Sequence, residues 1–458
     1  MNSANERSLF LLKKAIWVYL LLIIFEGALR KWVLPGLSTP LLVIRDPIAL
    51  WILFVAWQNG FLPKTIYLTG MIILGALGII TAMLFGHGSL PVAIFGARIL
   101  MIHFPLLFAI GKILNKEDVL QIGRVLLWIS IPMGILIGLQ YYSPQSAWVN
   151  KSVSGGDGGG GFSGANGFFR PPGTFSFITG NALFFELVAV YVVYFWLHSK
   201  LVNIIILSGA TVAVLASIPF SISRGLFFTI LVIVFFAVIA TLKDRKYLGK
   251  IITASIVMVI GIALLSQMST FQTAIDTFLF RFTSANKTEG GIEGTLGDRY
   301  FGGMISALAE SGEMPFFGYG IGMGTNVGSM LLTGGTSFLI SEQEWGRVLG
   351  EMGTLMGLGV IFIRLGLCWK MTVNAYKKLS AGDMLPWMLL SLGLLTIPQG
   401  QWAQPTNLGF SIMIGGLIIA SMRSSTDEHH VQEVSEDDKF INKEDGNNST
   451  LLSVNLKA

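Results

Sequence analysis

The chain has 458 residues, of which 53% are hydrophobic and only 12% charged, and its formal net charge is +5 at pH 7. A soluble globular domain carries roughly a quarter charged residues. This composition therefore excludes an ordinary soluble fold and indicates a polytopic membrane protein. Cytoplasmic loop lysines and arginines account for the net charge, which gives no support for nucleic-acid binding.

Apolar runs near twenty residues long recur along the chain and predict an all-α fold with about twelve transmembrane helices. The N-terminus is placed in the cytoplasm, because Lys and Arg then fall mostly in inner loops, as resistance of positive charge to translocation requires. An even number of spans puts the C-terminus inside as well. The predicted spans are 15–34, 41–57, 65–86, 90–111, 118–142, 174–197, 201–220, 225–242, 250–266, 346–369, 384–398 and 406–422.

These spans divide the chain into five parts. We predict a cytoplasmic N-terminus over 1–14, nine spans over 15–266, a large outer loop over 267–345 and three spans over 346–422. The remaining segment, 423–458, carries eight acidic residues against three lysines and few large apolar groups. Such a composition predicts a disordered cytoplasmic tail.

Several charges fall within predicted spans, where each costs roughly 2.5–3.5 kcal/mol near the bilayer centre. Glu26 with Arg30, and Arg45 with Asp46, are close enough in sequence to neutralise each other. Arg98 has no obvious partner in the sequence. It is therefore the best internal candidate to face a polar cavity.

Few cations fall in the predicted outer loops, and those that do lie mostly in motif-like stretches. Arg170 opens the run 170–175 (Arg-Pro-Pro-Gly-Thr-Phe), after a glycine-rich stretch that we read as a flexible spacer. Arg224 lies in a Ser-Arg-Gly element between two spans. Cations kept outside against the usual bias are candidates to bind an anionic, lipid-linked phosphate.

Within the large outer loop, residues 298–312 predict a helix, because apolar residues recur there at helical spacing after Asp298, a good N-cap. Arg299 then lies in the first turn, beside free backbone N–H groups, which favours an anion site. The alternative is that Arg299 only pairs with Asp298 or Glu310. The alternating glycines of 318–324 favour a turn that returns the loop to the membrane.

Glu342 and Glu344 stand at the mouth of the tenth span. A carboxylate at a half-dry membrane mouth can act as a general base, although either residue could instead be an interfacial anchor. Arg347 and Glu351 are spaced to form an i,i+4 pair. Arg364, deeper in the same span, is expected to extend toward the cytoplasm.

In order and in predicted side of the membrane, these motifs resemble the O-antigen ligase and polymerase superfamily, bacterial membrane glycosyltransferases that use polyprenyl-diphosphate-linked glycans. The run 170–175 followed by 180–182 resembles the family's Arg-x-x-Gly-Thr-Phe…Pro-Asn-x-x-Ala stretch, with glycine for proline at position 180. Residues 223–225 resemble its Ser-Arg-Gly element. Residues 298–299 with 315–322, and then 351–353, resemble its large-loop and Glu-x-Gly elements.

One position departs from the ligase pattern. Family ligases carry His-Asn about nine residues before the glutamate of Glu-x-Gly, and this chain has Glu342-Gln343 there. The absence of that histidine puts transfer to a lipid A core in doubt. It favours the polymerase branch or a divergent transferase.

The resemblance implies a GT-C-like fold in the bacterial inner membrane, with a lipid diphosphate as donor and no cofactor or metal. It implies polymerisation of polyprenyl-diphosphate-linked oligosaccharide units at the outer face, beside membrane lipid and assembly proteins such as a flippase or a chain-length regulator. The alternatives are ligase-type transfer to another acceptor and transport of the lipid-linked glycan. The candidate residues are Arg299 with Glu342 or Glu344 for catalysis, and Arg224, Arg170 and Arg98 for the diphosphate.

Overall fold

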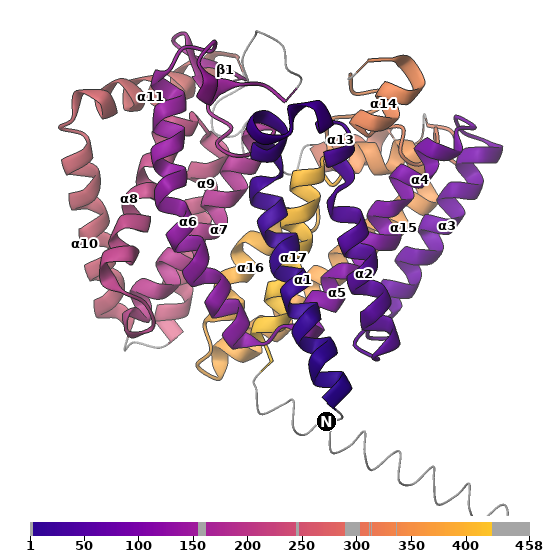
Figure 1. Ribbon diagram of the computed structural model, residues 1–458, viewed down its shortest axis with the longest axis horizontal. Coiled ribbons are helices and arrows are strands. Elements are labelled where there is room, and N and C mark those ends of the chain that lie inside the picture. The colour runs from indigo at the N-terminus through magenta and orange to yellow at the C-terminus, as the bar shows by residue number, and fades with distance from the viewer. Residues whose placement is uncertain are drawn as a thin grey trace, which may run out of the picture.

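The computed structural model describes residues 3–153, 162–243, 247–288, 303–310, 312, 314–335 and 337–423. Within them nearly all regular structure is helical, which confirms the all-α prediction. Most long helices run side by side in one bundle (Figure 1). The predicted tail lies outside the described residues apart from Arg423, and Arg299 lies outside them as well.

The elements follow the predicted spans closely. The α-helices are α1 (Ser3–Ala28), α2 (Arg45–Gln58), α3 (Ile66–Leu84), α4 (Leu90–Arg98), α5 (Phe104–Ile113), α6 (Lys116–Tyr142), α7 (Ile178–Leu197), α8 (Ile204–Ser221), α9 (Arg224–Lys243), α10 (Leu248–Leu265), α11 (Ser269–Thr288), α13 (Gly303–Glu310), α14 (Asn326–Thr333), α15 (Glu344–Ser380), α16 (Leu385–Thr396) and α17 (Pro405–Ser421). Short helical turns are η1 (Leu29–Val33), η2 (Pro35–Leu37), η3 (Pro40–Val43), η4 (Ile99–His103), η5 (Trp148–Asn150) and η6 (Ser199–Leu201).

Every predicted span contains a helix, although not every helix has the length of a full crossing. In the described part of the chain, nine helical stretches are long and apolar enough to cross a membrane, and α4, η4 and α5 form one of them. The chain is thus a multi-pass membrane protein by the length and composition of its helices. The apolar helices α16 and α17 are shorter, with 12 and 17 residues.

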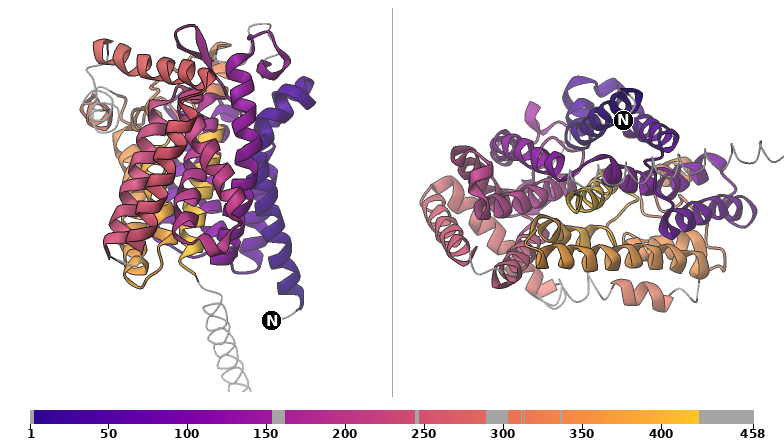
Figure 2. Two further views of the ribbon diagram at one scale, coloured as in Figure 1. Left: turned by 90° about the vertical axis from the view of Figure 1, so that its left-hand side faces the viewer. Right: turned by 90° about the horizontal axis from the view of Figure 1, so that it is seen from below.

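The bundle has two distinct ends (Figure 1). We call the end that carries β1, α11, α13 and α14 the cap end, and the opposite end, where the N-terminus lies, the N-terminal end. Helix α11 lies across the cap end instead of running along the bundle (Figure 2). The described parts of both long segments predicted to lie outside the membrane, 143–173 and 267–345, thus reach the same end of the molecule.

Helix α17 lies near the centre of the bundle (Figure 2). It packs against α1, α5, α6, α7, α15 and α16. Nearly every residue from Asn407 to Ser421 is buried. Because an apolar surface all round a helix must be covered on every side, this sequence specifies a central helix.

A β-hairpin lies in the first long segment and was not predicted. Strand β1 (Phe162–Ala165) pairs antiparallel with β2 (Phe168–Arg170), and Phe162 lies opposite Arg170. The turn contains Asn166 and Gly167, both with positive φ (49° and 78°). Asn-Gly between two short strands is a strong local signal for such a turn, so the sequence contained the information.

Helix α15 bends sharply at Gly353, where φ is 72° and ψ is 172°. The glycine-rich run 318–324 packs into this bend: Tyr319 N–H donates to Gly350 O (2.7 Å) and Gly320 N–H to Glu351 O (3.0 Å). On its other side the run touches α4, where a Cβ on Gly96 would overlap the backbone of the run. The run therefore returns the cap to the helices by close backbone contact, which explains its glycines.

The bend predicts a strong effect for Gly353→Ala. A side chain there would overlap the carbonyl of Phe316, and its backbone region is almost restricted to glycine, with a cost of about 1–3 kcal/mol from strain alone. The melting temperature of the purified protein in detergent should fall clearly. Gly249→Ala, where a Cβ meets nothing within 4 Å, is the control and should leave it unchanged or slightly raised. Equal melting temperatures would contradict the bend.

Candidate functional site

Five charged side chains from α1, η1, α2 and α4 meet toward the cap end, and we call them the arginine cluster. Arg30 donates to Glu26 at 3.3 Å, and Arg45 Nε lies 3.1 Å from the other oxygen of Glu26. Arg98 donates to both carboxylate oxygens of Asp46, at 2.5 and 2.7 Å. The cluster thus contains three guanidinium groups but only two carboxylates, so it carries excess positive charge.

Arg45 is the least satisfied member of the cluster. It is only 3% exposed, and neither Nε nor Nη1 makes a hydrogen bond with any described residue. Its Nη1 packs directly against Gly409 of α17, where any side chain would overlap it. Arg45 Nε keeps its ion pair with Glu26, but a buried donor that makes no hydrogen bond costs about 1–3 kcal/mol, and more when it is charged, so this guanidinium has hydrogen-bonding capacity left for an added anion.

The loop after β2 covers the cluster. Lys31 is 2% exposed, and its Nζ donates to the carbonyls of Gly173 (2.7 Å) and Phe175 (2.9 Å). Arg30 donates to Ser176 Oγ at 3.0 Å. These contacts hold a non-helical turn, in which Phe175 N–H donates to Pro172 O at 3.1 Å, so α7 begins only at Ile178 and not at residue 174, where the span was predicted to start. With Lys31 included, the buried cations outnumber the two carboxylates by two.

The predicted residues Arg170 and Arg224 both lie at the junction of α8 and α9. Arg170 Nε donates to Ser221 O at 3.3 Å. Arg224 begins α9 and is 7% exposed. The hydroxyl of Ser223 accepts from Leu226 N–H at 3.2 Å and so caps the helix. Part of the Ser-Arg-Gly element therefore has a structural role in the turn.

A second buried network joins the two halves of α15. Arg347 donates to Glu344 through Nε (3.0 Å) and Nη2 (2.8 Å), and to Glu351 through Nη1 (2.6 Å). Arg364 Nη1 donates to Glu344 at 2.6 Å. Two arginines and two glutamates make this network neutral, in contrast to the arginine cluster. The predicted pair of Arg347 and Glu351 is confirmed.

Arg364 corrects one prediction. It does not extend toward the end of the bundle, because it is only 1% exposed and its Nε donates to Ile397 O at 2.7 Å. The bend at Gly353 folds the first half of α15 back over the second, which brings residue 344 within reach. The guanidinium also stacks over the ring of Trp402, 3.8 Å from its centroid.

The two candidate bases differ in environment. Glu344 is 3% exposed, is held by two arginines, and also accepts from Trp402 N–H at 3.1 Å. Glu342 is exposed, and its backbone carbonyl accepts from Gln401 Nε2 at 2.9 Å. A carboxylate fixed between two guanidinium groups is stabilised in its ionised form and makes a weak base. The geometry therefore favours Glu342 over Glu344.

The local pairing predicted for Arg45 and Asp46 is wrong. Arg45 lies against Glu26, whereas Asp46 binds Arg98 and lies 2.9 Å from His103 Nε2. Adjacent residues on a helix point in different directions, so this pairing was sterically poor. Arg98 accordingly has a partner 52 residues away in sequence, which no local spacing reveals.

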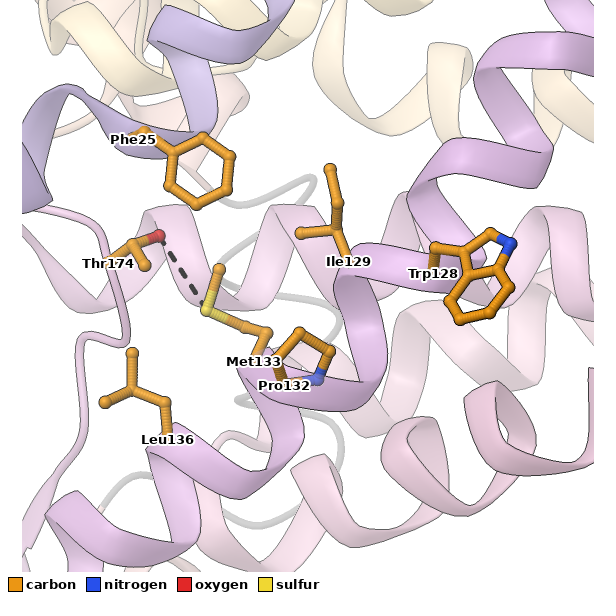
Figure 3. A pocket seen from close by; sticks show the side chains of 7 residues that line it. All are labelled: Phe25, Trp128, Ile129, Pro132, Met133, Leu136 and Thr174. Carbon is orange, nitrogen blue, oxygen red and sulfur yellow. Dashed lines mark hydrogen bonds between the residues drawn. The ribbon is translucent and has the colours of Figure 1, made fainter. Parts of the chain in front are cut away.

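An apolar groove of about 280 Å³ separates α1 from α6 beside the covering loop. In Figure 3 the side chains of Thr174 and Met133 point toward one another, and the Thr174 hydroxyl lies 3.7 Å from the sulfur. Thr174 lies between the two residues whose carbonyls bind Lys31. The lining residues are Phe25, Trp128, Ile129, Pro132, Met133, Leu136 and Thr174.

In the described part of the chain, no group of three or more His, Cys, Asp or Glu residues is placed to hold a metal ion. Comparison of the sequence with models of known protein families and with curated proteins gives no match.

The neutral network predicts that substitutions of Glu342 and Glu344, two positions apart, differ strongly in their effect on stability. Glu344→Gln leaves two buried arginines without their counter-charge, which costs about 3–5 kcal/mol, so the melting temperature and the yield of folded protein should drop sharply. Glu342→Gln removes an exposed charge and should change stability by about 0.5 kcal/mol or less. Similar unfolding curves for the two variants would contradict the network.

Proposed function

We propose that this chain is a membrane glycosyltransferase that polymerises oligosaccharide units carried on a polyprenyl diphosphate. The observation that carries the proposal is the arginine cluster, in which buried positive charge exceeds buried negative charge beside the motif loop 170–175. Burying charge without compensation is costly, so such an excess favours an anionic ligand. The order of the motifs described above supports the same ligand class.

The diphosphate fits the cluster in charge. Arg30, Lys31, Arg45 and Arg98 face only Glu26 and Asp46 among the ion pairs and hydrogen bonds described above. A diphosphate supplies the missing negative charge and several acceptor oxygens. Arg45, with two donors that make no hydrogen bond to a described residue, is the residue that we expect to contact it most directly.

The apolar groove fits the first part of the polyprenyl chain. Its walls are hydrocarbon and aromatic, and Trp128 is 60% exposed on its rim. At the other side, Thr174 connects the groove to the carbonyls that hold Lys31. A lipid lying in the groove would therefore have its headgroup near the cationic side of the loop.

The reaction needs no nucleotide sugar. An acceptor hydroxyl attacks the anomeric carbon, the bond from that carbon to the diphosphate oxygen breaks, and the lipid diphosphate leaves with the bonding electrons. Arginines stabilise the charge that develops on it. Glu342 takes the hydroxyl proton. Arg170, Arg224 and Arg299 remain proposed contributors to diphosphate binding.

The charges at the two ends of the bundle support an orientation with the cap end outside. Lysines and arginines concentrate at the N-terminal end, as the tendency of positive charge to stay in the cytoplasm favours. Those at or near this end are Lys112, Lys116, Lys200, Lys243, Lys250, Lys370, Lys377 and Arg423.

Incubation of the purified full chain in lipid nanodiscs with lipid-linked oligosaccharide from its native cells tests the activity. A ladder of lipid-linked glycans, each longer by one repeat unit, is expected on gels or by mass spectrometry. Transfer to an added second acceptor without a ladder would assign the chain to the ligase type. No new glycosidic bond under any condition would remove the enzyme assignment.

Arg45→Gln should separate function from stability. A lost charge-assisted hydrogen bond is worth about 1.5–3 kcal/mol, so chain growth should slow by roughly 10- to 150-fold. The melting temperature should fall only modestly, because Glu26 loses its ion pair with Arg45 but stays paired with Arg30. Arg124→Gln, on an exposed position of α6, is the control. Normal chain growth in Arg45→Gln would remove this residue from the site.

A further inference from the structure

A second pocket, of about 330 Å³, lies at the N-terminal end, on the side opposite the arginine cluster. It is formed by the ends of α3, α5 and α17 and by the middle of α15. Its size falls within the roughly 300–1,000 Å³ typical of small-molecule sites. The lining residues are Pro63, Thr65, Tyr67, Phe108, Gly111, Lys112, Leu367, Lys370, Met371, Asn374, Ile419, Met422 and Arg423.

Three cations border this pocket, and none of the described residues that line it is acidic. Arg423 donates to the backbone carbonyl of Lys112 and to that of Leu114, the latter at 3.3 Å. These bonds fix the end of α17 against the end of α5, so two of the cations are adjacent. Lys370 projects from α15 and lies over the ring of Tyr67, 5.9 Å from its centroid.

Most of the remaining lining is apolar, and Thr65, Tyr67 and Asn374 add polar groups. Phe108, Ile419 and Met422 provide hydrocarbon surface on α5 and at the end of α17. Small soluble anions gain little from such walls, whereas an amphiphile with an anionic head uses both parts of the pocket. Basic pockets between transmembrane helices on the cytoplasmic side are suited to anionic lipid headgroups.

We propose that this pocket binds an anionic phospholipid such as phosphatidylglycerol. The lipid phosphate lies among Lys112, Lys370 and Arg423, and the first methylenes of the chains lie against Phe108 and Ile419. The bound lipid joins α5, α15 and α17 at their N-terminal-end side. This site is separate from the proposed glycan chemistry, and its test uses no glycan, so the two proposals can fail independently.

Native mass spectrometry of the full chain, released from nanodiscs, tests the site. We expect the wild-type protein to retain phosphatidylglycerol in preference to phosphatidylcholine, and phosphatidylglycerol to raise its melting temperature. The triple variant Lys112→Gln/Lys370→Gln/Arg423→Gln should bind the anionic lipid on the order of 100-fold more weakly, at about 1 kcal/mol per cation. The control Arg124→Gln/Lys200→Gln/Lys377→Gln removes the same charge from exposed positions outside the pocket and should keep the preference.

Three results would overturn the proposal. Equal loss of binding in the control would mean that general surface charge attracts the lipid. Equal retention of phosphatidylcholine would mean that the head charge is not recognised. Displacement of the lipid by soluble glycerol phosphate would assign the pocket to a soluble anion. If the triple variant does not fold, Lys112→Gln/Lys370→Gln leaves the carbonyl contacts of Arg423 intact and should still weaken binding by more than 10-fold.

Discussion

Charges buried in an apolar bundle must be compensated by charges from other segments, and this requirement fixes how the helices of this protein meet. Glu344 and Arg364 join the two halves of α15, and Asp46 and Arg98 join α2 to α4. In such surroundings, breaking one pair costs several kcal/mol because the remaining charge has no water to solvate it. Each pair therefore sets the relative depth and rotation of the two segments it connects.

The two charge groups obey this requirement differently. The network around Glu344 carries no net charge and is buried. Its carboxylate accepts hydrogen bonds from Arg347, Arg364 and the Trp402 N–H, as expected of a structural element. The arginine cluster is unbalanced and includes a guanidinium with unused donors. Both groups are buried in the same bundle, so the difference in their charge balance indicates different roles. The balanced group holds α15 in its bent form, and the unbalanced group is the one suited to receive a ligand.

The helices were predictable because a membrane span needs about twenty apolar residues in succession, and this signal is local. Pairs one helical turn apart, such as Arg347 with Glu351, were predictable for the same reason. The partners of Arg98 and Arg364 were not, because they depend on which helices become neighbours and on a bend at one glycine. The late start of α7 depended likewise on Lys31, far away in the sequence. The role of Arg45 in the candidate site emerged only from burial, which spacing does not reveal.

The central position of α17 has a consequence for how the protein is made. Ribosomes release the chain from its N-terminus, so the helices that surround α17 are in the membrane before their core exists. Until α17 arrives, Arg45 lacks Gly409, which packs against its guanidinium in the folded protein. The earlier helices must therefore stay loosely packed, and water or insertion factors must solvate some of their charges. The surrounding helices pack together when α17, the final described helix, enters between them. Biogenesis is therefore cooperative at its last step and not at its first.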